Sequence, residues 1–223
     1  MSHWLKLLLT TVLLATALGT RAADPAPDEV LRQTTDEVIA YIKQDKDVLA
    51  GDRQKTYALV EAKIVPHFDF VRMTRLAVGK NWGKATPEQQ TALVDSFRNL
   101  LVRTYSTALT RFRNQTIAYK PWSGNAADPT ATVQSTVADG GRNIPLDYSL
   151  SHADGSWKVY DIKVDGISLV TNYRSDFTER VAATGIDGLI KDLQDKAHAA
   201  ESKPTDGKAA EPKAAEPKAA KKS

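Results

Sequence analysis

The sequence of 223 residues contains no cysteine. The fold therefore cannot depend on disulfide bonds, and we expect no lipid anchor, because the lipobox of an anchored protein needs a cysteine. Nor does the chain contain an apolar run of the roughly 20 residues that a transmembrane helix requires. These absences predict a domain that is held together by its apolar core alone.

Several catalytic motifs are also absent from the sequence. There is no G-x-x-x-x-G-K-[ST] segment, so ATP cannot be bound by a P-loop and any energy must come from a partner. There is no G-x-S-x-G segment of a serine hydrolase either. His67 follows a proline that ends a helix and His152 lies at a strand end or loop, and neither has the spacing of a metal-binding pair. We therefore expect no enzyme activity, no cofactor and no metal site.

The two ends of the chain differ in composition from its middle. Residues 1–22 combine a basic start, an uncharged stretch and small residues at the end, which is the layout of a cleaved secretory signal. Residues 203–223 repeat the pattern KAAEP, whose prolines prevent a continuous helix. We expect a signal peptide at 1–22 with cleavage near Ala22, a single domain at 23–202 and a disordered tail at 203–223. The natural compartment is a bacterial periplasm, although a retained membrane anchor is the alternative for the first segment.

The net charge of +3 is concentrated at the ends of the chain. Residues 23–202 carry 22 basic and 24 acidic side chains, so the domain itself is slightly negative. Nucleic-acid binding depends on clustered lysine and arginine facing phosphate. We therefore expect no nucleic-acid partner.

Apolar residues at helical spacing predict that the first half of the domain is helical. The expected helices cover residues 28–50, 52–65 and 68–76. A fourth and longer helix begins at Thr86-Pro87-Glu88-Gln89, which supplies an N-cap, a proline in the first turn and a capping-box glutamine. Because the apolar stripe of this helix continues for about seven turns, we expect it to be the spine of the fold.

After Asn114 the period changes to two, which predicts strands. The segments "QTIAYKPW", "TATVQSTV" and "NIPLDYSL" are followed, after a short loop, by "WKVYDIKV", which completes a hairpin. In the last strand the alternation slips, because Trp157 and Val159 share one face whereas Tyr160 and Ile162 share the other. Either a β-bulge reorients the strand or both faces are covered, and both alternatives bend the sheet.

Two amphipathic helices are expected after the strands, at residues 168–184 and 186–199, and Gly185 separates them. A tight turn at Asp165-Gly166 precedes the first of these helices. The order of helices, strands and helices predicts an α+β domain with a strongly curved antiparallel sheet of about four strands covered by helices.

Three blocks of sequence resemble the MlaC family, whose members are also called toluene-tolerance or phospholipid-binding ABC transporter auxiliary proteins. The blocks are "IVPHFDFVRMTRLAVGKNW", "ATPEQQTALVDSFRNLLVRTY" and "VYDIKVDGISLVTNYRSDF" followed by "GIDGLIKDL". They occur in the family's order and spacing between about residues 28 and 193, after a signal peptide. The C-terminal tail is a departure that the family does not need.

The resemblance implies a monomeric periplasmic carrier that holds the tails of a glycerophospholipid in an apolar cavity between the curved sheet and the helices. It also implies the partners. These are an inner-membrane ABC transporter complex with an MCE-type substrate-binding subunit and an outer-membrane lipoprotein complex. The resemblance implies that the carrier exchanges lipid with both complexes and so supports outer-membrane lipid asymmetry.

A lipid cavity needs aliphatic and aromatic walls from both the sheet and the helices. We expect the Asp165-Gly166 turn to fold the following helix back over the sheet as one wall, and Arg174 is a candidate for contact with a phosphate. The residues expected to line the cavity are Trp82, Phe97, Leu101, Tyr105, Val133, Ile144, Tyr148, Trp157, Val159, Ile162, Leu169, Tyr173 and Phe177.

Two other interpretations stay open. Aromatic stripes at helical spacing are usually plain core, so the domain could be an envelope adaptor with a filled interior. Alternatively, a small cone-shaped hydrolase or isomerase of the nuclear-transport-factor-like type would use Asp161 or Asp165 as a base beside a tyrosine.

Overall fold

The computed structural model describes residues 24–109, 115–125, 127–153 and 155–202. The expected signal peptide and tail lie outside these residues. No helix within the described ranges combines the length and the apolar character that crossing a membrane requires.

Helices form the first half of the described chain, as the sequence predicts. They are α1 (Pro27–Gln44), α2 (Lys46–Leu49), α3 (Arg53–Lys63), η1 (Val65–His67), α4 (Phe70–Val78), η2 (Gly79–Lys84) and α5 (Pro87–Leu109). The helix expected at 28–50 is interrupted at Asp45, because its carboxylate accepts hydrogen bonds from the backbone of Asp47 and Val48 and starts α2. The capping box of α5 is confirmed, since Thr86 and Gln89 exchange backbone-to-side-chain hydrogen bonds of 3.1 and 3.2 Å.

The strands form one antiparallel sheet in the order β1-β2-β3-β4-β5. They are β1 (Thr116–Tyr119), β2 (Thr130–Asp139), β3 (Arg142–Ala153), β4 (Ser156–Val164) and β5 (Ile167–Ser168). Four strands match the expectation, and the fifth is a two-residue strand that the Asp165-Gly166 turn folds against β4. Both turn residues have positive φ, at 50° and 78°, which is the geometry of a tight two-residue hairpin.

A β-bulge in β4 explains the slip in the alternation of its side chains. The register between β3 and β4 shifts at Ser149 and Leu150, which leaves Tyr160 as the extra residue. The bulge resets the alternation, so the apolar side chains before and after it share one face of the sheet. These side chains are Trp157, Val159, Ile162 and Val164.

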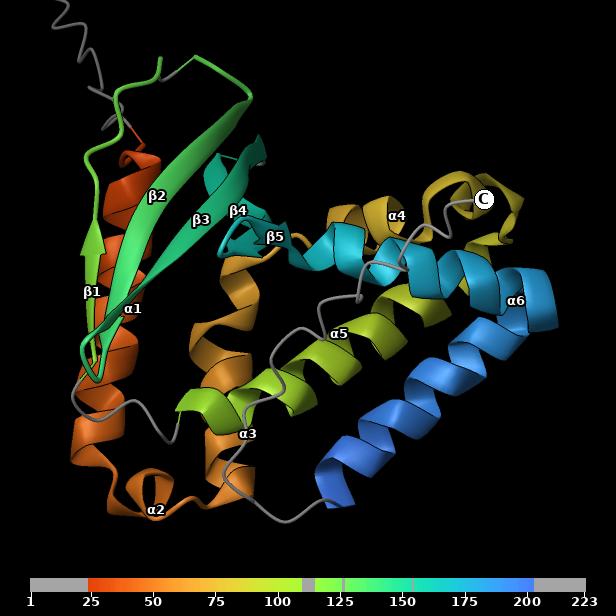
Figure 1. The fold of residues 1–223 in the computed structure, drawn as a ribbon, viewed down its shortest axis with the longest axis horizontal. Coiled ribbons are helices and arrows are strands. Elements are labelled where there is room, and N and C mark those ends of the chain that lie inside the picture. The colour runs from red at the N-terminus through yellow and green to blue at the C-terminus, as the bar shows by residue number, and fades with distance from the viewer. Residues whose placement is uncertain (1–23, 110–114, 126, 154, 203–223) are drawn as a thin grey trace, which may run out of the picture.

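The last helix, α6 (Leu169–Ser202), is bent at Gly185, whose φ of 74° and ψ of −176° are not helical, as the sequence predicts. Its first turn is fixed to β4 because the buried carboxylate of Asp161 accepts a hydrogen bond of 3.1 Å from the backbone of Val170. In Figure 1, α6 leaves the sheet, runs beside α5 and α4, and then turns back at the bend.

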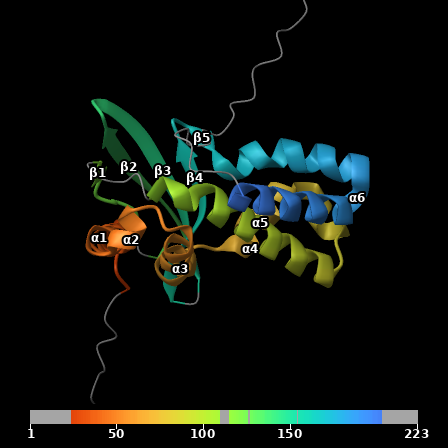
Figure 2. The same cartoon turned by 90° about the horizontal axis from the view of Figure 1, so that it is seen from below.

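The elements form two regions side by side (Figures 1 and 2). In one region, α1 lies against the sheet and packs on it through Leu31. In the other, α4, α5 and α6 enclose a core centred on Phe97 and Leu93. α3 lies between the two regions and packs on both α1 and α5. The junction between sheet and helices is where the main cavity occurs.

Candidate functional site

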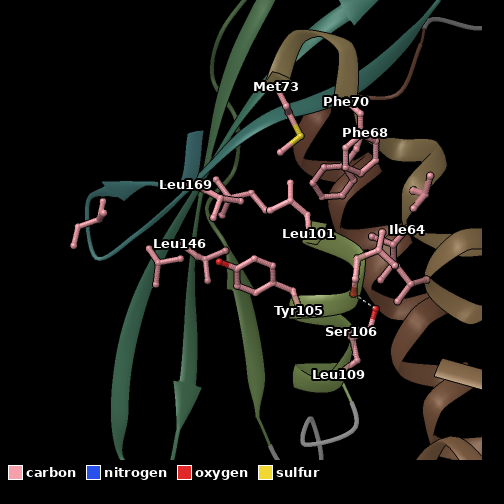
Figure 3. Close-up of a pocket in the computed structure, with 16 residues that line it drawn as sticks. Ile64, Phe68, Phe70, Met73, Leu101, Tyr105, Ser106, Leu109, Leu146 and Leu169 are labelled. Carbon is pink, nitrogen blue, oxygen red and sulfur yellow. Dashed lines mark hydrogen bonds between the residues drawn. The ribbon is translucent and has the colours of Figure 1, made fainter. Parts of the chain in front are cut away.

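A cavity of about 390 Å³ lies between one face of β3, β4 and β5 and the helices α3, α4 and α5. Its volume is within the range of roughly 300–1,000 Å³ that is usual for small-molecule sites. In Figure 3, Tyr105 extends from α5 toward Leu146 of β3, and Leu101 points toward Leu169. The lining residues are Val60, Ile64, Val65, Phe68, Phe70, Met73, Leu101, Val102, Tyr105, Ser106, Leu109, Leu146, Ile162, Val164, Ile167 and Leu169.

The segment between η1 and α4 ties the helices to the edge of the sheet. Phe68 pairs with Val159 in an isolated parallel bridge, and the backbone N–H of Asp69 donates to the carbonyl of Val159 at 2.9 Å. The rings of Phe68 and Phe70 stack at 5.7 Å and line one end of the cavity. The sheet and the helices are therefore joined at this end, and the cavity lies between them beyond this junction.

The wall of the cavity is almost entirely apolar. Its polar side chains are Tyr105 and Ser106, and the hydroxyl of Ser106 donates to the carbonyl of Val102 within α5. The hydroxyl of Tyr105 is hydrogen bonded to Tyr173, and burial raises the pKa of the Tyr105 phenol. Both polar groups are neutral near pH 7 and have partners in the protein, so the cavity suits alkyl chains and not a charged group.

The acidic residues considered as catalytic bases do not line this cavity. Asp161 is buried and its carboxylate holds the first turn of α6. Asp165 is exposed at the β4–β5 turn. The histidines have other contacts, since His67 lies 3.5 Å from the hydroxyl of Thr34 and His152 lies 3.1 Å from the carboxylate of Asp24. Across the part of the chain that the structure describes, no three metal-ligating side chains converge.

Comparison with known proteins identifies the family. The family model of the MlaC protein matches residues 32–195. The chain belongs to the MlaC family. This confirms the resemblance inferred from the three sequence blocks, and the C-terminal tail lies outside the matched range.

Two curated proteins and one solved structure are similar to this MlaC-family chain. Toluene tolerance protein Ttg2D of Pseudomonas putida is 26% identical over 203 residues, which cover 88% of this chain and 94% of that protein. The intermembrane phospholipid transport system binding protein MlaC of Haemophilus influenzae is 19% identical over 201 residues, with the same coverage of 88% and 94%. A phospholipid-binding protein from Ralstonia solanacearum, solved in complex with a phospholipid, is 39% identical with a TM-score of 0.74 and covers 79% of this chain and 99% of its own.

Four of the residues expected to line the cavity of this MlaC-family fold do so. They are Leu101 and Tyr105 on α5, Ile162 on β4 and Leu169 at the start of α6. They come from α5 and from the later segment of β4 and α6, which are far apart in the sequence and meet at the junction of sheet and helices.

Four other expected residues lie in the helical core and do not line this cavity, so α6 contributes Leu169 to its wall but not Tyr173 or Phe177. Trp82, Phe97, Tyr173 and Phe177 pack together between α4, α5 and α6. The ring of Phe97 contacts those of Tyr173 and Phe177 edge to face, at centroid distances of 5.0 and 5.1 Å. The reason is the direction of α6, which leaves the edge of the sheet at β5 and packs along α5 and not over the sheet.

The remaining expected residues lie on the sheet but outside the cavity. Val133, Trp157 and Val159 are buried in the cluster that Leu31 of α1 covers, and Tyr148 packs against that cluster. Ile144 is half-buried near the far end of β3 and does not line the cavity. The same apolar sheet face is thus shared between a helix and a cavity, and alternation in sequence does not distinguish the two.

Sequence reasoning did not include the wall that α3, η1 and α4 provide. This wall comprises Val60, Ile64, Val65, Phe68, Phe70 and Met73. The sequence contains one indication of this wall, because large apolar residues occur on both sides of the helix-ending proline in "IVPHFDF". Arg174, considered for a phosphate, instead donates through Nε to the carbonyl of Leu76 at 2.9 Å, at the end of α4.

Proposed function

We propose that this protein is a periplasmic carrier that shuttles phospholipid between an inner-membrane ABC transporter complex and an outer-membrane lipoprotein complex, and so supports outer-membrane lipid asymmetry. The observation that carries the proposal is the open, uncharged cavity of about 390 Å³ between sheet and helices. The phospholipid in the Ralstonia solanacearum structure, a relative at 39% identity, supports the choice of ligand.

The energetics of lipid transfer require a carrier of this kind. A diacyl lipid with about 30 buried methylenes gains on the order of 20 kcal/mol on leaving water, at ~0.8 kcal/mol for each methylene. Diffusion of the free lipid through an aqueous gap is therefore negligible. Transfer from the cavity into the apolar site of a partner replaces one apolar environment by another, so the free energy change is small.

The proposal includes the maturation of the chain. The signal at 1–22 directs export and is removed near Ala22, the domain at 23–202 binds lipid as a monomer, and the tail at 203–223 is a solvated linker. The MCE-type subunit of the inner-membrane complex is the proposed contact on that side.

The two alternative functions are less well supported by the geometry. An adaptor with a filled core would not need the space that Ile162, Leu146 and Tyr105 border. A hydrolase or isomerase would need an acid or base in the cavity, whereas Asp161 is engaged at the start of α6.

The test is whether lipid accompanies the purified protein. Protein from a bacterial periplasm should carry glycerophospholipid through native chromatography, detected by organic extraction and mass spectrometry at a stoichiometric level. A fluorescent-lipid assay with the two purified partner complexes should then show transfer. A folded, monomeric sample without lipid would favour the adaptor.

A further inference from the structure

A group of positively charged side chains lies on α4, η2 and the first part of α6. Between Phe70 and Thr86 the sequence contains four basic residues and no acidic residue, although residues 23–202 as a whole carry more acidic than basic groups. We refer to this group, together with the arginine of α6 that lies against it, as the cationic face. Its members are Arg72, Arg75, Lys80, Lys84 and Arg174.

Contacts between α4 and α6 bring these residues together. The side chain of Arg174 lies over Gly79, and its Nε donates to the carbonyl of Leu76 at 2.9 Å. Arg174 is therefore next to the end of α4, where Arg75 and Lys80 are both exposed. The two helices lie side by side in both views (Figures 1 and 2).

The cationic face has no acidic partners of its own. Among the residues that the structure describes, no carboxylate lies within ion-pair distance of any of its five cations. Three arginines elsewhere form ion pairs, namely Arg98 with Glu61, Arg103 with Glu201 and Arg180 with Asp192. The positive potential of this face is thus available to an external anionic group.

The same helices form part of the cavity. Phe70 and Met73 of α4 and Leu169 of α6 line it. Two large apolar residues next to these lining residues are exposed. Val71, which follows Phe70 in the chain, has an exposed fraction of 58%, and Ile167, which itself lines the cavity, has an exposed fraction of 40%. Exposed apolar groups with charged residues around them are typical of the centre and rim of a protein interface.

We propose that the cationic face is the docking surface for an acidic face of a protein partner, which brings the partner's lipid site to the cavity. This inference rests on the proposed carrier function. Three of the five cations are arginines, whose planar guanidinium pairs well with carboxylates. The guanidinium of Arg72 lies over the ring of Tyr160 at 3.8 Å and Nε of Arg174 donates to Leu76, so Arg75 and the other N–H groups of these two arginines would serve the partner. A membrane surface is less suitable, because an amphipathic helix binds in a bilayer interface through its apolar face. In α4 the apolar side chains Met73, Ala77 and Val78 are already buried in the helical core.

The experiment measures binding of the purified inner-membrane ABC transporter complex to the full mature chain. The test variant reverses three exposed cations of the face, Arg75→Glu, Lys80→Glu and Lys84→Glu. The control variant makes the same change in net charge at exposed sites outside the face, Lys43→Glu, Lys46→Glu and Arg142→Glu. We expect the test variant to bind at least about tenfold more weakly at low salt and the control to bind within about twofold of the unmodified protein. The difference should shrink as the salt concentration rises.

The lipid content of each variant is measured in parallel, which distinguishes a failure of the proposed docking surface from a failure of the proposed carrier function. If both variants bind the complex as well as the unmodified protein and retain lipid, the docking surface is wrong and the carrier function stands. If the control loses as much affinity as the test variant, net charge and not this face is responsible. Failure of the unmodified protein to bind the complex would overturn both the docking surface and the shuttle. Binding to vesicles of phosphatidylethanolamine and phosphatidylglycerol that the test variant loses would assign the face to a membrane and overturn the choice of a protein partner.

Discussion

An acidic side chain placed in the cavity should abolish lipid binding while a matched substitution outside it should not. Ile162 on β4 lines the cavity, whereas Ile144 on the neighbouring strand β3 is also half-buried but does not. Replacing Ile162 removes an apolar contact of about 1.5–3 kcal/mol with the bound chain. An ionised carboxylate covered by an acyl chain costs several kcal/mol more. The total of at least about 4 kcal/mol corresponds to roughly a thousandfold loss of affinity.

The assay compares Ile162→Glu with Ile144→Glu by lipid extraction and mass spectrometry after native chromatography. Both variants should keep a native circular dichroism spectrum, because the empty cavity admits water to the new carboxylate and Ile144 is already partly exposed. The reasoning is refuted if Ile162→Glu retains stoichiometric lipid or if Ile144→Glu loses it equally. Unfolding of Ile162→Glu alone would show that this side chain is ordinary core.

Three further predictions concern stability. Asp161→Ala should lower the free energy of unfolding by about 1–2 kcal/mol, seen as a lower melting temperature, because the backbone N–H of Val170 loses its acceptor, and Asp161→Asn should restore much of the loss. Desolvation raises the pKa of the Tyr148 phenol, so the folded state keeps a proton that the unfolded state loses above pH ~10. Stability should therefore fall by up to about 1.4 kcal/mol per pH unit there, and denaturation of Tyr148→Phe at high pH should show a shallower slope, whereas an unchanged slope would contradict the assignment. Removal of residues 203–223 should leave both the melting temperature and the lipid content unchanged, and a marked fall in either would mean that the tail packs on the domain.

Local interactions made much of the fold predictable from the sequence. The capping box at Thr86 and Gln89, the bend at Gly185 and the turn at Asp165-Gly166 each depend on residues close in the chain, and the structure contains all three. The slip in the alternation of β4 predicted either a β-bulge or a strand covered on both faces, because it shows that a strand is irregular but not how its partner is aligned. The register with β3 shows a β-bulge, with Tyr160 as the extra residue.

The sequence by itself determined which side chains face inward, and the tertiary structure decided what they face. Phe97 and Leu101 lie on the same apolar stripe of α5, yet Phe97 contacts the rings of α6 and Leu101 also borders the cavity. The difference arises because α6 leaves the sheet at β5 and packs along one part of α5, while η1 and α4 tie the sheet edge to the helices at Val159. Burial of apolar surface is non-directional, so a pattern of apolar residues specifies an inner face but not whether another side chain or an open space lies against it. Only the packing of the helices on the sheet creates that space.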